Sequence, residues 1–280
     1  MRIERLLKTI EEILPRETAI EGDRIGLQIQ SGRNEIQNLL FTIEVDDKVI
    51  EEAVKLKCDC IITFHPLIFF PLTSIQDTDR VGKLTTKLIS NSISLISIHT
   101  NFDSYSKGTS RIFANLLGLE TKRFLIPDKS VSGRGMGVIA CPKNSLKLDD
   151  LISRLHSICN APIRYTIGKK SDKIESVAIV GGSGTAFFED AISAGVDAFI
   201  TADISYHTFH RAKGRLTLID AGHYEMEQFV PLGLMNLLKE NLKDSEINSY
   251  KLSKQLTNPV LYYPYTDKYS TKQKDYLLNR

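Results

Sequence analysis

The feature that most constrains the fold is an alternation of short apolar runs with amphipathic segments. Short apolar runs are typical of buried strands, whereas apolar residues that recur every three or four positions are typical of helices. Strands that alternate with helices favour βα units with parallel pairing. The predicted strands are 37–43, 59–64, 93–98, 137–141, 175–180, 197–201 and 216–220. The predicted helices are 47–57, 82–91, 108–118, 147–158, 185–194, 205–213 and 224–242.

The strand–helix units fall into two sets, and a chain of 280 residues has room for about two domains. We therefore expect an α/β fold with two lobes, built from mixed, mostly parallel sheets flanked by helices. The N-terminal lobe would cover 1–130, a small middle segment 131–172, and a C-terminal lobe 173–263. The lobe over 173–263 would complete a metal-binding cleft. The remaining 264–280 form a polar, Tyr-rich tail.

The charge balance limits the partners of this chain. It carries 36 Lys and Arg against 34 Asp and Glu, so no strong field for nucleic acid or a membrane is expected. Residues 1–14 have the spacing of an amphipathic helix, not of a signal peptide, and no apolar stretch reaches the roughly 20 residues that span a bilayer. Four cysteines without a disulfide spacing indicate a reducing compartment. We expect a soluble, cytoplasmic protein.

Two short motifs each admit two interpretations. Cys58 and Cys60 form a CxC that could hold a metal, although thiols at a strand start are more often small core residues. The glycine-rich turn 181–184 (GGSG) could cradle a phosphate with its backbone amides, or could simply be a tight turn that needs small residues. Arg24 and Lys107 are candidate charges near a substrate.

Three of the six histidines directly follow predicted strands. His65 follows DCIITF, His99 follows ISLISI and His223 follows LTLIDAG, while Asp203 follows VDAFIT. In α/β sheets, ligand sites lie outside the carboxyl ends of the strands. Each strand-end histidine alone would be explained as a hydrogen-bonded structural residue, but together they favour a metal site. The other histidines differ: His156 and His210 are expected on solvated or partly buried helix faces.

Two of these histidines stand four residues before a carboxylate. His99 precedes Asp103 in HTNFD, and His223 precedes Glu227 in HYEME. Residues i and i+4 share one face of a helix, so both groups can point to one ion. Imidazole and carboxylate together suit Zn, Mn or Fe(II) better than Ca. Glu227 could also bridge two ions, as two-metal hydrolysis requires.

The chain resembles the Nif-three-like family, whose members are called GTP cyclohydrolase 1 type 2 homologs. The resemblance runs from about Asp23 to Pro259 and rests on ordered motifs: DRIGL, TFHPLIF, HTNFD, VAIVGGSG, ITADISYH and DAGHYEME. It implies a two-lobed α/β fold with a di-metal cleft, assembled as a homohexameric ring. If the cyclohydrolase name applies, the attacked carbon lies in the imidazole ring of a purine.

The resemblance also implies the metal ligands. One ion would be held by His65, Asp103 and Glu227, and a second by His223, Glu227 and a histidine at the position that Phe64 occupies here. Because Phe cannot ligate metal, we expect one firm site and a second, weakened one. Glu44 stands where the family commonly has Asp.

Two functions remain open at this stage. The first is a metal-dependent hydrolase of the GTP cyclohydrolase or phosphoesterase kind, acting on a nucleotide or related heterocycle, with His99 and His207 as catalytic residues that move protons. The second is a non-catalytic, metal-binding, ring-shaped scaffold or regulatory protein, which the loss of a ligand at Phe64 favours.

Overall fold

The computed structural model describes residues 1–168, 173–243 and 246–263, which form two compact units. Unit 1 comprises Met1–Phe102 and Val230–Thr257, and unit 2 comprises Asp103–Phe229 and the chain from Asn258. The units divide the chain differently from the expected lobes 1–130 and 173–263, because residues 103–130 belong to unit 2 and Val230–Thr257 packs with the N-terminal part. The predicted tail 264–280 lies outside the described residues. No helix within the described residues is long and apolar enough to span a membrane.

Unit 1 is built on a five-stranded sheet of order β1-β4-β3-β2-β13. Strands β13, β2, β3 and β4 run parallel to one another, and β1 is antiparallel to β4. The central strands are buried on both faces, as expected for apolar parallel strands. The strands are β1 (Gly26–Ile29), β2 (Asn38–Thr42), β3 (Cys60–Thr63), β4 (Ser94–Ser97) and β13 (Ser249–Leu252).

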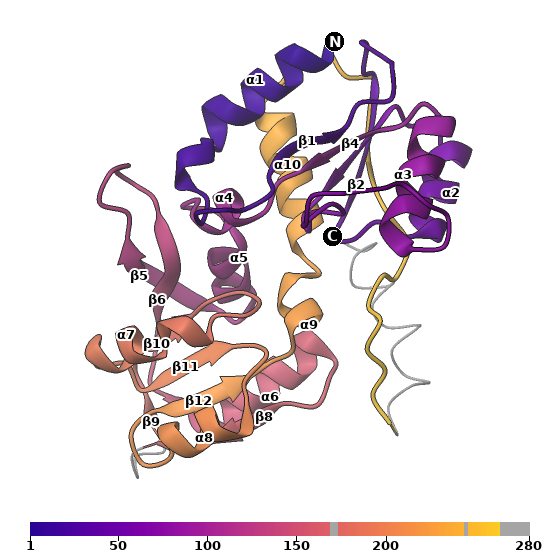
Figure 1. Ribbon diagram of the computed structural model, residues 1–280. Coiled ribbons are helices and arrows are strands. Elements are labelled where there is room, and N and C mark those ends of the chain that lie inside the picture. The colour runs from indigo at the N-terminus through magenta and orange to yellow at the C-terminus, as the bar shows by residue number, and fades with distance from the viewer. Residues whose placement is uncertain (169–172, 244–245, 264–280) are drawn as a thin grey trace. The chain divides into compact units, whose positions relative to one another are not determined.

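Helices cover both faces of the unit 1 sheet (Figure 1). Helices α2 (Asp47–Lys55) and α3 (Arg80–Ser90) pack their apolar stripes on one face, against residues such as Leu40, Ile61 and Leu95. Helices α1 (Ile3–Ile13) and α10 (Val230–Asn241) lie on the other. The short η1 (Arg16–Thr18) follows α1.

Unit 2 is built on a six-stranded sheet of order β5-β6-β10-β11-β12-β8. Its three middle strands, β10 to β12, are parallel, and the flanking pairings are antiparallel. A separate pair joins β7 (Leu146–Lys147) to β9 (Lys173–Ile174). The sheet strands are β5 (Leu119–Pro127), β6 (Gly135–Pro142), β8 (Arg164–Thr166), β10 (Val177–Ile179), β11 (Ala198–Thr201) and β12 (Thr217–Asp220).

The alternation of side chains along these strands supplies two cores in unit 2. Val177, Ile179 and Ile200 face the first core, with helices α5 (Thr109–Leu116), α6 (Leu148–Cys159) and α9 (His223–Glu227). Ala178 and Phe199 face the second, with α7 (Phe188–Ser193) and α8 (Tyr206–Ala212). The short helices α4 (Thr100–Asp103) and η2 (Thr185–Phe187) complete the described elements.

The predicted mixed α/β class with flanking helices is confirmed, and each predicted strand is present with ends shifted by a few residues. The expectation of mostly parallel pairing describes the first sheet, where three of four pairings are parallel. In the second sheet two of five are parallel. The three antiparallel pairings involve β5, β6 and β8. Of these strands, β5 and β8 were not predicted, because they carry charged and polar residues in place of an apolar run.

The single helix predicted over 224–242 is wrong. The chain forms α9 and α10 separately, with a break at Gln228–Phe229. Pro231 explains the break, because a proline ring clashes with the carbonyl four residues earlier, and that residue is Glu227. The proline therefore ends α9 directly after Glu227 and lets the chain leave unit 2 for unit 1.

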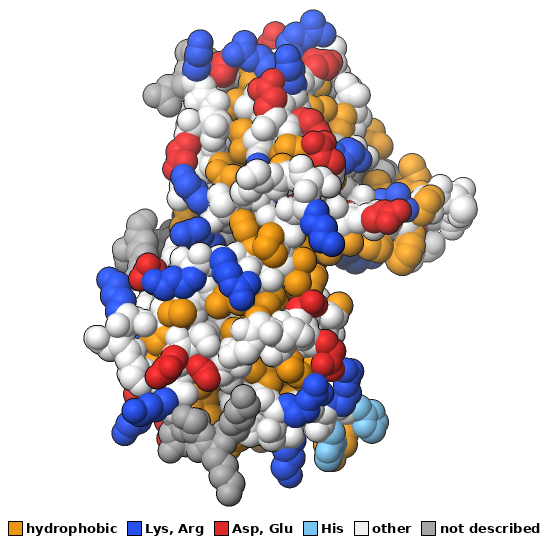
Figure 2. Space-filling view, turned by 90° about the vertical axis from the view of Figure 1, so that its left-hand side faces the viewer, with side chains coloured by type: hydrophobic (Ala, Val, Ile, Leu, Met, Phe, Trp, Pro, Cys, Tyr) orange, Lys and Arg blue, Asp and Glu red, His pale blue; other side chains and the backbone are white. Residues whose placement is uncertain are grey.

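On the face drawn in Figure 2, basic and acidic side chains are interspersed. This distribution agrees with the near balance of 36 basic and 34 acidic residues.

Candidate metal centre

In unit 1, three polar side chains follow the carboxyl ends of neighbouring parallel strands. Glu44 follows β2, His65 follows β3 and His99 follows β4. The parallel ladder continues past the strand ends, since the amides of Phe64 and His65 donate to the carbonyls of Thr42 and Ile43 at 3.0 and 2.9 Å. The sheet therefore fixes the backbone that carries His65.

His65 is oriented by a carboxylate. Its Nδ1 lies 2.8 Å from Oε1 of Glu44, and its side chain is 18% exposed. Arg80 donates to Glu44 at 3.4 Å and to the carbonyl of Val45 at 2.8 Å, which holds the carboxylate in turn. When Nδ1 donates to a carboxylate, Nε2 is the ring nitrogen that presents its lone pair.

His99 has the same arrangement. Its Nδ1 lies 2.9 Å from Oδ1 of Asp23, a buried carboxylate that also accepts from the amide and the hydroxyl of Thr100. Burial opposes the charge of Asp23, but the hydrogen bonds from His99 and Thr100 outweigh it and lower its pKa to about 2. Asp23 therefore stays ionised near neutral pH and fixes the His99 ring.

Phe64 lies against both imidazoles. Its ring is fully buried, with centroids 5.1 Å from His65 and 5.3 Å from His99. The two imidazole rings are 5.4 Å apart, edge to face. An apolar ring thus occupies the position at which the family resemblance implies a histidine.

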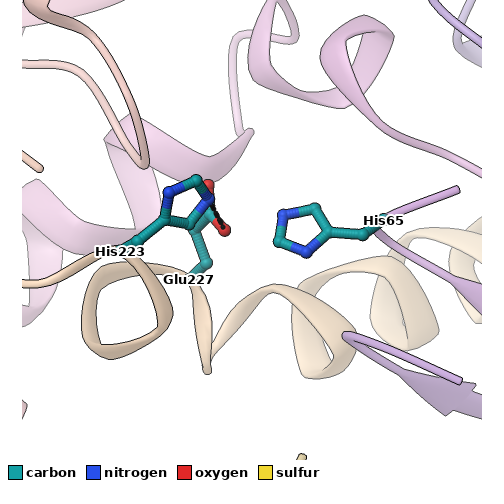
Figure 3. A group of neighbouring side chains, drawn as sticks. All are labelled: His65, His223 and Glu227. Carbon is teal, nitrogen blue, oxygen red and sulfur yellow. Dashed lines mark ion pairs between the residues drawn. The ribbon is translucent and has the colours of Figure 1, made fainter. Parts of the chain in front are cut away.

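In unit 2, one imidazole lies between two carboxylates. His223 opens α9, and its Nδ1 lies 2.6 Å from Oδ2 of Asp203, which follows β11. Its Nε2 lies 3.1 Å from Oε2 of Glu227, one helical turn later (Figure 3). The predicted i, i+4 geometry on a helix is therefore present. Figure 3 draws this ion pair together with His65 of unit 1.

Gly182 makes room for this pair. It has φ +62°, and a Cβ there would lie 2.2 Å from Oε1 of Glu227 and 3.1 Å from Nε2 of His223. Two backbone amides of this turn already have partners within the protein, because Gly181 donates to the hydroxyl of Ser110 and Gly184 to that of Thr201. For the GGSG motif, the structure thus supports a tight turn that needs small residues.

The two carboxylates change the titration of His223. Burial alone would lower its pKa, but the hydrogen bond and charge of Glu227, followed by those of Asp203, raise it from 6.5 to about 9. Without a metal, His223 is therefore protonated at neutral pH. Its ion pairs stabilise the fold fully below about pH 6.5, and this stabilisation is lost as the pH rises through about 9.

The donor set fits a transition-metal ion. Unit 1 supplies His65, an imidazole whose Nδ1 is held by a carboxylate, and unit 2 supplies His223, held in the same way, with the buried carboxylate Glu227, which is 4% exposed. Histidine ligands in metal sites donate their other ring N–H to a carboxylate or carbonyl in this way. His65 in unit 1, and His223 and Glu227 in unit 2, are each candidate ligands for such an ion.

The other predicted site residues lie as follows. Asp103, the last residue of α4, is half-buried. His207 is exposed on α8, with its ring 5.6 Å from that of Tyr206. The exposed His210 also contacts Tyr206, at 4.6 Å, and Nδ1 of His156 pairs with the Ala161 carbonyl at 2.9 Å.

The remaining candidates are structural or peripheral. Cys58 and Cys60 are buried, and burial raises the pKa of both thiols, that of Cys58 to about 11. Both are therefore core residues. Arg24 donates from Nε to the Phe69 carbonyl at 3.1 Å, and Lys107 is exposed.

Glu44 and Asp23 have functions in the structure that were not predicted from the sequence. Each holds the Nδ1 of a predicted site histidine in the structure. A signal for Glu44 was present, since it follows its strand just as His65 follows the next one. Asp23 comes before β1 and carries no such signal, because only tertiary structure brings it to Thr100.

Comparison with known proteins decides the family. A sequence profile of Duf34/NIF3 (NGG1p interacting factor 3) matches residues 1–259. The chain belongs to the Duf34/NIF3 family. The resemblance inferred from the ordered motifs is thereby confirmed.

Curated members of the Duf34/NIF3 family include close matches over most of the chain. A GTP cyclohydrolase 1 type 2 homolog of Clostridium acetobutylicum is 32% identical over 230 residues, which is 81% of this chain and 85% of that protein. A protein of the same name from Clostridium perfringens is 31% identical, over 92% of this chain and 98% of that one.

Solved structures show the same fold. A Staphylococcus aureus hypothetical protein matches with a TM-score of 0.86 and 29% identity, covering 94% of this chain and 99% of its own. A Bacillus cereus protein related to NIF3 has a TM-score of 0.82 at 22% identity, with 94% and 99% coverage, and supports the fold alone.

The first prediction concerns His223. In metal-free protein its imidazole should titrate near pH 9, and Glu227→Gln should lower the midpoint toward 6.5, because the largest favourable partner of the charged ring is removed. NMR of the imidazole protons measures both midpoints. A wild-type midpoint close to 6.5 would mean that the ion pair with Glu227 does not form in solution.

Proposed function

We propose that this Duf34/NIF3 protein is a metal-dependent hydrolase acting on a nucleotide or related heterocycle. His65 would join His223, Glu227 and Asp103 around a divalent ion, Zn, Mn or Fe. The observation that carries the proposal is the repeated pairing of a strand-end imidazole with a carboxylate, Glu44 with His65 and Asp203 with His223. The names of the curated relatives support a nucleotide-related substrate.

The bound ion would lower the pKa of a coordinated water and so supply hydroxide near neutral pH. Glu44 and Asp203 would hold the Nδ1 protons of their imidazoles, so that each ring presents Nε2. Asp23 would do the same for His99, which would then accept or return a proton at Nε2. His207 is the second candidate for moving protons, and its exposure on α8 lets it meet solvent.

A non-catalytic metal-binding scaffold or regulatory protein is the second candidate. Phe64 is the observation that favours it, because a buried apolar ring against His65 and His99 replaces a ligand and leaves room for fewer ions. In either case, the homohexameric ring and the cytoplasmic location implied above belong to the proposal.

The second prediction concerns substrate turnover, in which the two candidate functions differ. Metal-loaded protein should hydrolyse GTP or a generic phosphoester, and His99→Ala should reduce kcat by about a hundredfold or more, since a positioned proton-transfer group typically contributes that much. The assay should include EDTA-treated protein and the exposed His210→Ala as controls. If the metal-loaded wild type turns over none of these substrates, the scaffold is the better account.

The third prediction concerns the carboxylates behind the imidazoles. Glu44→Ala and Asp203→Ala should each weaken Zn binding about tenfold to a hundredfold, because an imidazole without its partner loses orientation and basicity. Competition with a fluorescent chelator measures the affinity. Glu21→Ala, at an exposed acidic position, is the matched control. Affinities equal to that control would remove the main support for the metal centre.

The fourth prediction follows from Phe64. The wild type should retain about one ion per chain after dialysis, and Phe64→His should raise this toward two, because an imidazole replaces the apolar ring that lies against His65 and His99. Elemental analysis gives the ratio, and Phe70→His in an exposed loop is the control. Two ions already in the wild type would show that Phe64 leaves the second site intact.

A further inference from the structure

The five-residue helix α9 cannot hold its own conformation. Isolated helices of this length are unstable in water, so the orientation of His223 and Glu227 depends on what packs around α9. Met226 anchors one side in the apolar core of unit 2. The other anchor is Glu225, which lies two residues from each ligand candidate and is 1% exposed. Two residues correspond to about 200° around a helix, so Glu225 points away from the metal side.

The carboxylate of Glu225 is held by a segment that returns from unit 1. Asn258 donates from Nδ2 to Oε1 of Glu225 at 2.8 Å, and the hydroxyl of Tyr262 donates to the same carboxylate. Burial, followed by the charge and hydrogen bond of Glu225, raises the pKa of Tyr262 to about 12, so its hydroxyl keeps the proton that it donates. Asn258 also accepts from the amide of Val260 at 3.0 Å, which tightens the segment.

Of the last three described residues, 261–263, Tyr262 is the one whose side chain is inserted. Tyr262 is half-buried and packs against the core of unit 2, whereas Leu261 and Tyr263 are 78% and 93% exposed. The match to the Duf34/NIF3 profile ends at residue 259, so Tyr262 lies beyond the part shared with that profile. Two side chains, Asn258 and Tyr262, donate to this buried carboxylate, and the loss of either donor would leave part of its hydrogen bonding unsatisfied, which is costly for a buried charge.

We propose that Asn258–Tyr262 is a clamp that sets the orientation of α9 through Glu225 and thereby the metal affinity of His223 and Glu227. Asn258, Tyr262 and Glu225 are positioning residues, since they act on the ion only through α9. This inference rests on the proposed metal centre.

The test compares Tyr262→Phe and Asn258→Ala in the full chain with Tyr263→Phe, which removes the same hydroxyl from an exposed neighbour. Tyr262→Phe should weaken Zn affinity about threefold to tenfold, less than loss of a carboxylate that contacts an imidazole directly, and should speed amide exchange at 223–228. Asn258→Ala should change both quantities in the same direction. Tyr263→Phe should match the wild type in both measurements.

Two results would overturn the clamp while leaving the metal centre in place. In the first, the wild type binds Zn, but Tyr262→Phe and Asn258→Ala leave both the Zn affinity and the amide exchange at 223–228 unchanged. In the second, Tyr262→Phe and Asn258→Ala speed amide exchange but bind Zn as tightly as Tyr263→Phe does. The segment would then stabilise α9 without affecting metal binding. A wild type that binds no Zn, Mn or Fe would refute the proposed function, and the clamp's metal role with it.

Discussion

The hydrogen bond between a strand-end imidazole and a carboxylate is the interaction on which the candidate site depends. It occurs three times, joining Glu44 to His65, Asp23 to His99 and Asp203 to His223. In each pair, a parallel strand fixes the histidine or the acid, and the hydrogen bond fixes the ring. An imidazole on a flexible side chain becomes a directed donor only under such constraints, because its tautomer and orientation follow from the bond at the other nitrogen.

These constraints also explain the less regular parts of the structure. Gly182 adopts a positive φ and leaves the space of one methyl group beside Glu227. Asp203 itself has φ +56°, a conformation that costs about 1 kcal/mol for a residue other than glycine, and it turns the chain directly after β11. Pro231 ends α9 immediately after Glu227. The strain at Asp203 therefore lies directly beside the imidazole that this residue orients.

Much of the fold could be predicted because its signals are local. Buried strands such as β3 and β12 have apolar centres, and the histidines after them lie at the edge of each sheet where ligand sites are expected. The i, i+4 pair of His223 and Glu227 could be predicted for the same reason. Strand β5 could not be predicted, because its charged residues form no apolar pattern and it is a strand only through its pairing with β6. Asp23 and the Glu225 contacts depend on segments that meet only after folding.

The central claim is that imidazoles oriented by carboxylates hold a divalent ion. Crystals grown with Zn and measured on both sides of its absorption edge test it most directly. The account predicts an anomalous peak about 2.0–2.2 Å from Nε2 of His65 and of His223 and from a carboxylate oxygen of Glu227. A peak at other residues, or Zn-grown crystals in which the imidazoles of His65 and His223 point away from each other, would contradict it.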